Sequence, residues 1–204
     1  MSYPRRSMGY DSVVLASASK RRSLLLDQIG VRHRLMAADL DEQPMPGEKP
    51  ADYVQRLARA KAGAVVATLG GRPDLPVLAA DTTVVLDGKI YGKPADLQDC
   101  VDILTALSGR RHEVLTAIAL EEGGSQRTAM NASFVTFRTI AAEECGRYWA
   151  SGEPAGKAGA YAIQGFGAVF IAMLEGSFSG VMGLPLFETA ALLDAAGVRR
   201  WRKP

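Results

Sequence analysis

Three consecutive cationic residues, Lys20, Arg21 and Arg22, follow a Ser-Ala-Ser stretch that begins at Ser17, between an apolar run and the start of a helical pattern. The first turn of a helix offers free backbone N–H groups and a positive dipole end, and both favour a bound anion. Cations are unfavourable there unless an anion sits among them. The segment predicts an anion site, with a solvated basic face as the alternative.

One carboxylate interrupts an otherwise apolar, β-branched run. Asp81 stands within residues 76–86, which are expected to form a buried strand. An ionised carboxylate in such a strand is costly unless a metal ion or a cationic side chain neutralises it. Asp81 is therefore a candidate functional residue, and a structural polar interruption is the alternative.

Further carboxylates lie in a Pro- and acid-rich loop over residues 39–50, which includes Glu42, and Lys61 follows in the next helical pattern. Carboxylate oxygens suit Mg²⁺, which takes one or two of them and completes its shell with water and substrate phosphate oxygens. The loop is thus a possible metal-binding segment. A solvated acidic surface is the alternative.

A glycine-rich stretch covers residues 152–165. It has neither the G-x-x-x-x-G-K-[ST] spacing of a P-loop nor a G-x-G-x-x-G after a strand. Gln164, next to its last glycine, carries an amide that can both donate and accept hydrogen bonds at a base edge. An ordinary turn residue is the alternative for Gln164.

The elements that must position these residues follow from hydrophobic periodicity and from Gly and Pro punctuation. Ser19 is expected to cap the first helix and Gly30 to end it, and Asp87-Gly88 predicts a hairpin with residues 89–91. Alternation of strands and helices gives way to clustered strands, which favours a mixed sheet with flanking helices. We expect strands over 13–16, 33–37, 76–86, 113–120, 129–140 and 166–174, and helices over 20–30, 51–69, 96–107, 141–150 and 186–196.

Composition bounds the protein class. With 204 residues, 48% of them hydrophobic and 23% charged, the chain is expected to form one domain around a substantial core. A formal charge of +2 and 7% aromatic residues argue against binding to nucleic acid. Cys100 and Cys145 are expected to be reduced packing residues. No signal peptide or apolar run of membrane-spanning length is apparent, so we expect a cytoplasmic protein without a membrane partner.

Taken together, these segments resemble the Maf family of nucleotide pyrophosphatases over residues 13–196, with residues 1–12 as an N-terminal extension expected to be flexible and 13–204 as a single catalytic domain. Thr82, the Ile-Gln-Gly around Gln164 and Glu175-Gly176-Ser177-Phe178 resemble the branch that acts on dTTP and UTP rather than on 7-methyl-GTP. The matching segments are Leu15 to Arg22, Ala80-Asp81-Thr82, Gly92-Lys93-Pro94, Leu107-Ser108-Gly109, Lys157 to Tyr161, Glu175-Gly176-Ser177 and Gly183-Leu184-Pro185-Leu186.

The resemblance implies an elongated α/β fold with a mixed β-sheet, flanking helices and two lobes around a central cleft, similar in outline to inosine triphosphate pyrophosphatases, and a homodimer. It implies hydrolysis of a nucleoside triphosphate to the monophosphate and pyrophosphate with Mg²⁺ or Mn²⁺. Lys20 departs from the family pattern, which usually has Pro there. The roles implied are Ser17, Arg21, Arg22, Lys61 and Lys93 for phosphate, Glu42 and Asp81 for the metal, Asp81 as proton acceptor, and Arg21, Thr82 and Gln164 for the base.

Another class of function stays open at this stage: a nucleotide-binding regulator of cell division or septum formation with little turnover. Release of pyrophosphate separates the two. The sequence does not decide between ordinary and modified pyrimidine nucleotides as the physiological substrate, nor does it give the preferred metal, the turnover rate or the dimer interface.

Overall fold

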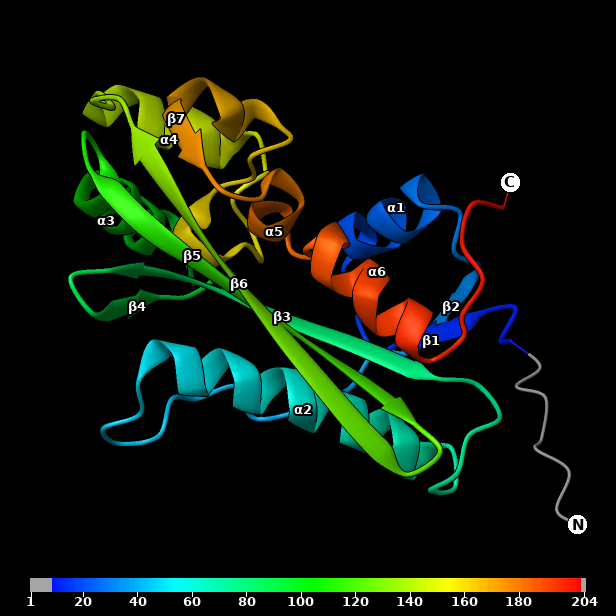
Figure 1. The fold of residues 1–204 in the computed structure, drawn as a ribbon. Helices are drawn as coiled ribbons and strands as arrows, with labels where there is room; N and C mark the ends of the chain where they lie inside the picture. The colour runs from blue at the N-terminus through cyan, green and yellow to red at the C-terminus, as the bar shows by residue number, and fades with distance from the viewer. Residues whose placement is uncertain (1–8, 203–204) are drawn as a thin grey trace, which may run out of the picture.

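A seven-stranded mixed sheet forms the frame of the molecule in a computed structural model that describes residues 9–202 (Figure 1). The strand order is β2-β1-β3-β5-β6-β7, and β4 pairs with β3 outside this path. The strands are β1 (Val13–Leu15), β2 (His33–Leu35), β3 (Val77–Leu86), β4 (Lys89–Tyr91), β5 (Arg111–Glu122), β6 (Ser125–Phe137) and β7 (Ile171–Glu175).

Helices cover both faces of this sheet. In Figure 1, α2 runs along one face of the long strands, while the other α-helices lie on the opposite side. The α-helices are α1 (Lys20–Gln28), α2 (Pro50–Thr68), α3 (Leu97–Leu107), α4 (Ala142–Ala150), α5 (Phe178–Met182) and α6 (Leu186–Ala195), and two 3₁₀ segments are η1 (Ala158–Ala160) and η2 (Phe166–Phe170).

The pairing directions confirm the expected mixed sheet. β1 is parallel to both β2 and β3, whereas β3, β5, β6 and β7 pair antiparallel in sequence. The long β5–β6 hairpin turns at Gly123 and Gly124, which both have positive φ, a conformation that glycine adopts without strain. Figure 1 shows α1, α6, β1 and β2 gathered near one end of the long strands and α3, α4 and β7 near the other, as expected for an elongated fold with two lobes.

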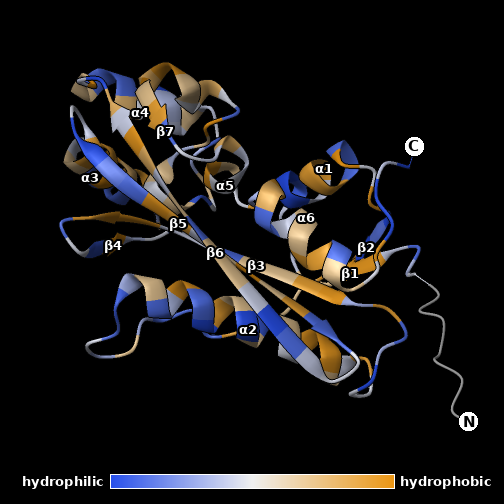
Figure 2. Ribbon diagram, viewed as in Figure 1, coloured by the Kyte–Doolittle hydropathy of each residue, from blue (hydrophilic) through white to orange (hydrophobic). Residues whose placement is uncertain are grey.

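Two hydrophobic clusters fill the opposite faces of the sheet. On the α2 side, small residues of the strands, such as Ala79 and Ala117, pack against Val54, Ala58 and Val65 of the helix. The other face buries larger side chains from α1, α3, α4 and α6. In Figure 2, β3 is largely orange, whereas α2 carries both orange and blue residues, as expected for a strand buried on both faces and an amphipathic helix.

Several strand ends differ from the sequence prediction: the strand expected over 129–140 is Ser125–Phe137, and the one expected over 33–37 ends at Leu35. Three further differences concern the type of structure or its capping. The strand expected over 166–174 is wrong in its first part, where Phe166–Phe170 forms a 3₁₀ segment, and only Ile171–Glu175 is strand. The short helix α5 was not predicted. Ser19 stands at the N-cap position of α1, but its side chain makes no capping hydrogen bond. Its backbone N–H donates to the Ser17 hydroxyl.

Near the N-terminus, Tyr10 forms an isolated parallel bridge with Val198. The predicted extension 1–12 otherwise falls mostly on residues 1–8, which lie outside the described part of the chain. Within residues 9–202, no helix is both long enough and apolar enough to span a bilayer. Cys100 and Cys145 are free and buried, as predicted for packing residues.

Candidate functional site

An unpaired stretch of β3 creates the main cleft. One edge of β3 pairs with β5 from Val77 to Val85. On the other edge the β1 pairing reaches only Leu78, and the β4 pairing begins at Val84. Among the described residues, no strand covers this edge between those two points. A cleft of about 780 Å³ opens there, lined by all the predicted site residues, namely Ser17, Arg21, Arg22, Glu42, Lys61, Asp81, Thr82, Lys93 and Gln164.

The alternation of a β-strand sends Asp81 and Thr82 to opposite faces of the sheet. Asp81 belongs to the face that α2 covers, together with Ala79 and Val85. Its side chain meets Lys61, which α2 supplies. Thr82 points toward the face of α1 and α5, where it meets Arg22. Two adjacent residues of one strand thus contact side chains from two different helices, α2 and α1, at the same cleft.

A chain of alternating charges runs along the acidic side of the cleft. The Lys61 ammonium donates to one oxygen of Asp81 and one of Glu42, with N–O distances of 2.6 Å each. Lys93, just beyond β4, donates to the second oxygen of Glu42 at 2.5 Å. Asp81 and Lys61 are only 7% and 9% exposed. The carboxylates that the sequence placed far apart therefore share one cation between them.

Burial and charge act differently on the two carboxylates. For Glu42, burial raises the pKa, but the hydrogen bonds from Lys61 and Lys93 outweigh this effect and lower the pKa to about 2. For the more deeply placed Asp81, burial raises the pKa above its usual value despite the opposing cations Lys61 and Arg22. Glu42 is thus the stronger acid of the pair, and Asp81 is the better proton acceptor.

The basic side of the cleft is held by α5. The Nε of Arg22 donates to the carbonyl oxygen of Gly183 at 2.7 Å, and the Nε of Arg21 to that of Met182 at 3.2 Å. Arg22 also donates through Nη1 to the Ser17 hydroxyl at 3.1 Å and through Nη2 to Thr82 at 3.2 Å. The guanidinium groups are therefore fixed through the carbonyls that end the short helix absent from the sequence prediction.

Thr82 is itself held by a buried neighbour on β5. Thr116 is fully buried, and its hydroxyl lies 2.9 Å from the Thr82 hydroxyl and 2.8 Å from the carbonyl oxygen of Gly180. This hydroxyl chain links β3, β5 and α5. Thr82 thus faces the cleft in a fixed rotamer, with Arg22 as its second partner.

A family model described as Maf-like protein matches residues 12–196. The chain belongs to the Maf family.

Relatives of this Maf chain carry one recurring name. A protein of Nitrosomonas europaea named dTTP/UTP pyrophosphatase is 51% identical over 196 residues, which cover 91% of this chain and 95% of that protein. A protein of Cupriavidus metallidurans with the same name is 52% identical over 192 residues, covering 90% and 96%. Among solved structures, the Staphylococcus aureus Ham1 protein aligns over 78% of this chain and 79% of its own at 16% identity, with a TM-score of 0.45.

Two further charged residues line the cleft of this Maf protein, and neither was assigned a role from the sequence. Glu153 and Lys157 both belong to the glycine-rich stretch after α4. Burial and the nearby Arg21 lower the pKa of Lys157. The sequence does contain a signal for these residues, because charged side chains stand in a glycine-rich loop between a helix and a strand. Only the path of that loop in the structure places them at the cleft.

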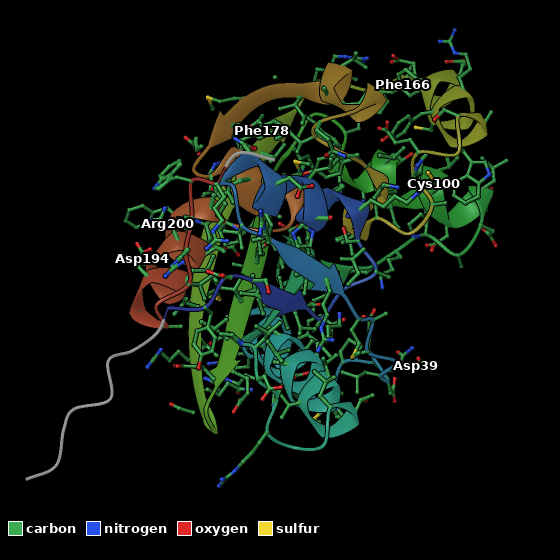
Figure 3. All side chains as sticks on the ribbon, turned by 90° about the vertical axis from the view of Figure 1, so that its right-hand side faces the viewer. Asp39, Cys100, Phe166, Phe178, Asp194 and Arg200 are labelled. Atoms are coloured by element: carbon green, nitrogen blue, oxygen red, sulfur yellow. The ribbon has the colours of Figure 1, made fainter. Side chains whose placement is uncertain are left out.

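The side view in Figure 3 places these loops relative to one another. Asp39 marks the loop that leads to Glu42, and Phe166 marks the segment that follows Gln164. The two lie on either side of α1.

His112 does not belong to the cleft. It is buried on β5, its Nε2 lies 3.0 Å from the Tyr161 hydroxyl, and its role is therefore structural. Among residues 9–202, no group of three or more His, Cys, Asp or Glu side chains is placed to hold a metal ion.

Proposed function

We propose that this protein is a nucleoside triphosphate pyrophosphatase that hydrolyses dTTP and UTP to the monophosphate and pyrophosphate. The observation that carries the proposal is that Lys61 contacts both Asp81 and Glu42 at 2.6 Å, in the same cleft that Arg21 and Arg22 line. The curated relatives named dTTP/UTP pyrophosphatase support it, because they share about half of the residues over nearly the whole chain.

Binding of the triphosphate is assigned to the cations of the cleft. A triphosphate carries about four negative charges, and catalysis of phosphoryl transfer is mostly positioning and charge neutralisation. Arg21, Arg22, Lys61 and Lys93 supply the positive charge, and the Ser17 hydroxyl lies beside Arg22. Because Arg21 and Arg22 are tied through Nε, the rest of each guanidinium group is positioned before substrate arrives.

Proton transfer is assigned to Asp81. Its position in the cleft lining, with one oxygen held by Lys61, suits a carboxylate that orients a water molecule and accepts its proton as that water attacks the α-phosphorus. The bond from the α-phosphorus to the bridging oxygen breaks, and pyrophosphate leaves. Lys61 donates to Asp81 and holds the carboxylate in place.

A divalent metal, Mg²⁺ or Mn²⁺, is proposed as the cofactor. The donor set fits, because Mg²⁺ binds through one or two carboxylates and takes further oxygens from phosphate and water. Glu42 and Asp81 both contact the Lys61 ammonium, so the two carboxylates lie within reach of a single cation. When bound, the metal would neutralise charge that develops on the phosphate oxygens.

Recognition of the pyrimidine is assigned to Gln164, Thr82 and Arg21. Gln164 presents an amide that can both donate to and accept from an imide edge, and Thr82 offers a hydroxyl. Arg21 lies in the same lining. Faster hydrolysis of 7-methyl-GTP than of dTTP and UTP would contradict this assignment, and a panel of ordinary and modified pyrimidine triphosphates would identify the preferred substrate.

The deciding experiment is Asp81→Asn, assayed by pyrophosphate release from dTTP with Mg²⁺ or Mn²⁺. Loss of a positioned base is expected to lower kcat by about 100-fold or more. Asp102→Asn, on the exposed surface of α3, is the matched control and should retain wild-type turnover. Turnover of Asp81→Asn within about tenfold of wild type would remove Asp81 from the chemistry.

The same assay decides between the enzyme and the alternative function, a nucleotide-binding regulator. Wild-type protein that binds dTTP without releasing pyrophosphate would favour the regulator. A homodimer is also proposed, on the family resemblance alone. Light scattering of the purified chain tests it, because a monomer would give half the expected mass. A cytoplasmic location stays a prediction that localisation of the tagged chain would check.

A further inference from the structure

The segment that carries Gln164 is fastened at both ends by two side chains from α4 and the turn after it. The Tyr148 hydroxyl accepts a hydrogen bond from the backbone N–H of Ala162 at 3.2 Å and donates one to Glu153 at 2.7 Å. Glu153 in turn accepts from the backbone N–H groups of Phe166 and Gly167, at 2.9 Å each. Gln164 lies between these fastened points.

Two glycines allow this close approach. A Cβ atom at Gly165 would stand 2.0 Å from a carboxylate oxygen of Glu153, and one at Gly167 would stand 2.6 Å from the Tyr148 hydroxyl. Both distances are far below van der Waals contact, so neither position could hold a larger residue without displacing the partner. Tyr148 and Glu153 therefore pack directly against the backbone next to Gln164.

The Gln164 side chain depends on this backbone for its direction. It is exposed in the cleft lining, and within residues 9–202 it has no side-chain hydrogen-bond partner. Local turn bonds, from Gly165 N–H to the Ala162 carbonyl and from Ala168 N–H to the Gly165 carbonyl, are the other ties of the segment. A specificity residue must be held within a fraction of an ångström to discriminate, and here the surrounding backbone must provide that precision.

We propose that Glu153, supported by Tyr148, is a positioning residue for base discrimination: it fixes the 162–167 segment so that Gln164 presents its amide to the base. The inference rests on the proposed pyrimidine triphosphate activity and assigns Glu153 no contact with the reacting atoms. It predicts that Glu153 acts on the choice between bases through Gln164 and leaves the polyphosphate subsite intact.

An opposing explanation is electrostatic. Glu153 lies near enough to Arg21 and Lys157 to raise the pKa of both, against the lowering caused by their burial. If Glu153 served only to balance these cations, its loss would alter polyphosphate binding and would affect all nucleotides alike. The experiment must therefore measure the base and the polyphosphate separately.

Glu153→Gln is the informative variant because it keeps the size of the side chain. One oxygen of Glu153 accepts from Phe166 N–H and the other from Gly167 N–H and Tyr148, so an amide group must face at least one N–H donor in either orientation. Glu144→Gln is the matched control, since Glu144 lies on the preceding helix α4 and is held by Arg138 and the Ala141 N–H, but it is not among the residues lining the cleft.

The measurement is the ratio of kcat/KM for dTTP to that for dCTP, whose base edges differ in donors and acceptors, in wild type, Glu153→Gln, Gln164→Ala and the double variant. We expect Glu153→Gln to lower the ratio by about tenfold, and by less than about twofold in the Gln164→Ala background, since coupled residues are not additive. Glu144→Gln should leave it unchanged. Inhibition by inorganic tripolyphosphate should be the same for wild type and Glu153→Gln.

Equal falls for dTTP and dCTP in Glu153→Gln, a change in tripolyphosphate inhibition in either direction, or the same effect with and without Gln164 would each overturn the inference. Failure of the proposed function is visible separately, as absence of dTTP hydrolysis by wild type. In that case calorimetric binding of dTMP against dCMP replaces the kinetic ratio. An unchanged preference between these two in Glu153→Gln would then overturn the positioning role.

Discussion

The Lys61 ammonium reaches from α2 to Asp81 on β3, with a nitrogen–oxygen distance of 2.6 Å and both side chains about nine-tenths buried. This contact joins the helix on one face of the sheet to the strand beside the cleft. Glu42 accepts from the same ammonium group. Because three charged groups converge there, the effects of removing one group and of removing another on the free energy of unfolding should not be additive.

The first prediction concerns stability. Lys61→Met should lower the free energy of unfolding by about 3 kcal/mol, because it leaves the buried Asp81 without its nearest cation. Asp81→Asn in the Lys61→Met background should restore part of this loss. Urea denaturation measures both. The exposed pair Arg110 and Asp87 is the control, and its coupling should stay below about 1 kcal/mol. Strictly additive effects at Lys61 and Asp81 would contradict the prediction.

The second prediction tests the geometry of Arg22 rather than its charge. Arg22→Lys keeps the positive charge, but one ammonium group cannot span Gly183, Ser17 and Thr82 as the guanidinium does. We expect kcat/KM for dTTP to fall by about 10- to 100-fold. Arg32→Lys, at an exposed position outside the cleft lining, should have no effect. A fall of less than about twofold for Arg22→Lys would show that charge alone suffices.

The third prediction is a pH dependence of stability. Burial lowers the pKa of His112 from 6.5 to about 4. Between these values the unfolded chain binds a proton that the folded chain does not, so this contribution to stability is present above pH 6.5 and is lost as the pH falls toward 4. From pH 7 to pH 5 the loss should be about 2 kcal/mol.

His112→Phe should flatten this slope. The ring lies edge-on to Phe137 and Tyr161, so an aromatic replacement keeps the packing while removing the titrating group. Loss of the contact with the Tyr161 hydroxyl lowers the free energy of unfolding by about 1 kcal/mol at every pH. The informative quantity is therefore the slope of the free energy of unfolding against pH. Urea midpoints at pH 5, 6 and 7 provide it, and parallel slopes for the two proteins would refute the role of His112.

The fourth prediction is a stabilising change. Lys20 is exposed and begins α1, a position that tolerates proline because its N–H has no helical partner. Ser19 before it has ψ of 110°, near the range that a residue preceding proline adopts. Lys20→Pro should raise the free energy of unfolding by up to about 1 kcal/mol. A lower urea midpoint would mean that Lys20 makes a contact worth more than the entropy gained.

Much of the framework was predictable because local chemistry fixes it. The apolar periods of α2 and β3, and the Asp87-Gly88 hairpin, appear where the sequence places them. The strand expected from Phe166 failed because the Glu153 carboxylate binds the N–H groups of Phe166 and Gly167, and this turns the backbone into a 3₁₀ segment. A contact across 14 residues leaves no periodic trace in the sequence.

The sequence by itself determined which residue types were available: clustered cations after a short strand, one carboxylate inside an apolar strand, and a glutamine in a glycine-rich stretch. Only the tertiary structure decided that Lys61 is shared by Asp81 and Glu42, and that Arg21 and Arg22 are held by the carbonyls ending α5. The physical reason is that side-chain type and strand alternation are local properties, whereas the pairing of distant charges depends on how helices pack on the sheet.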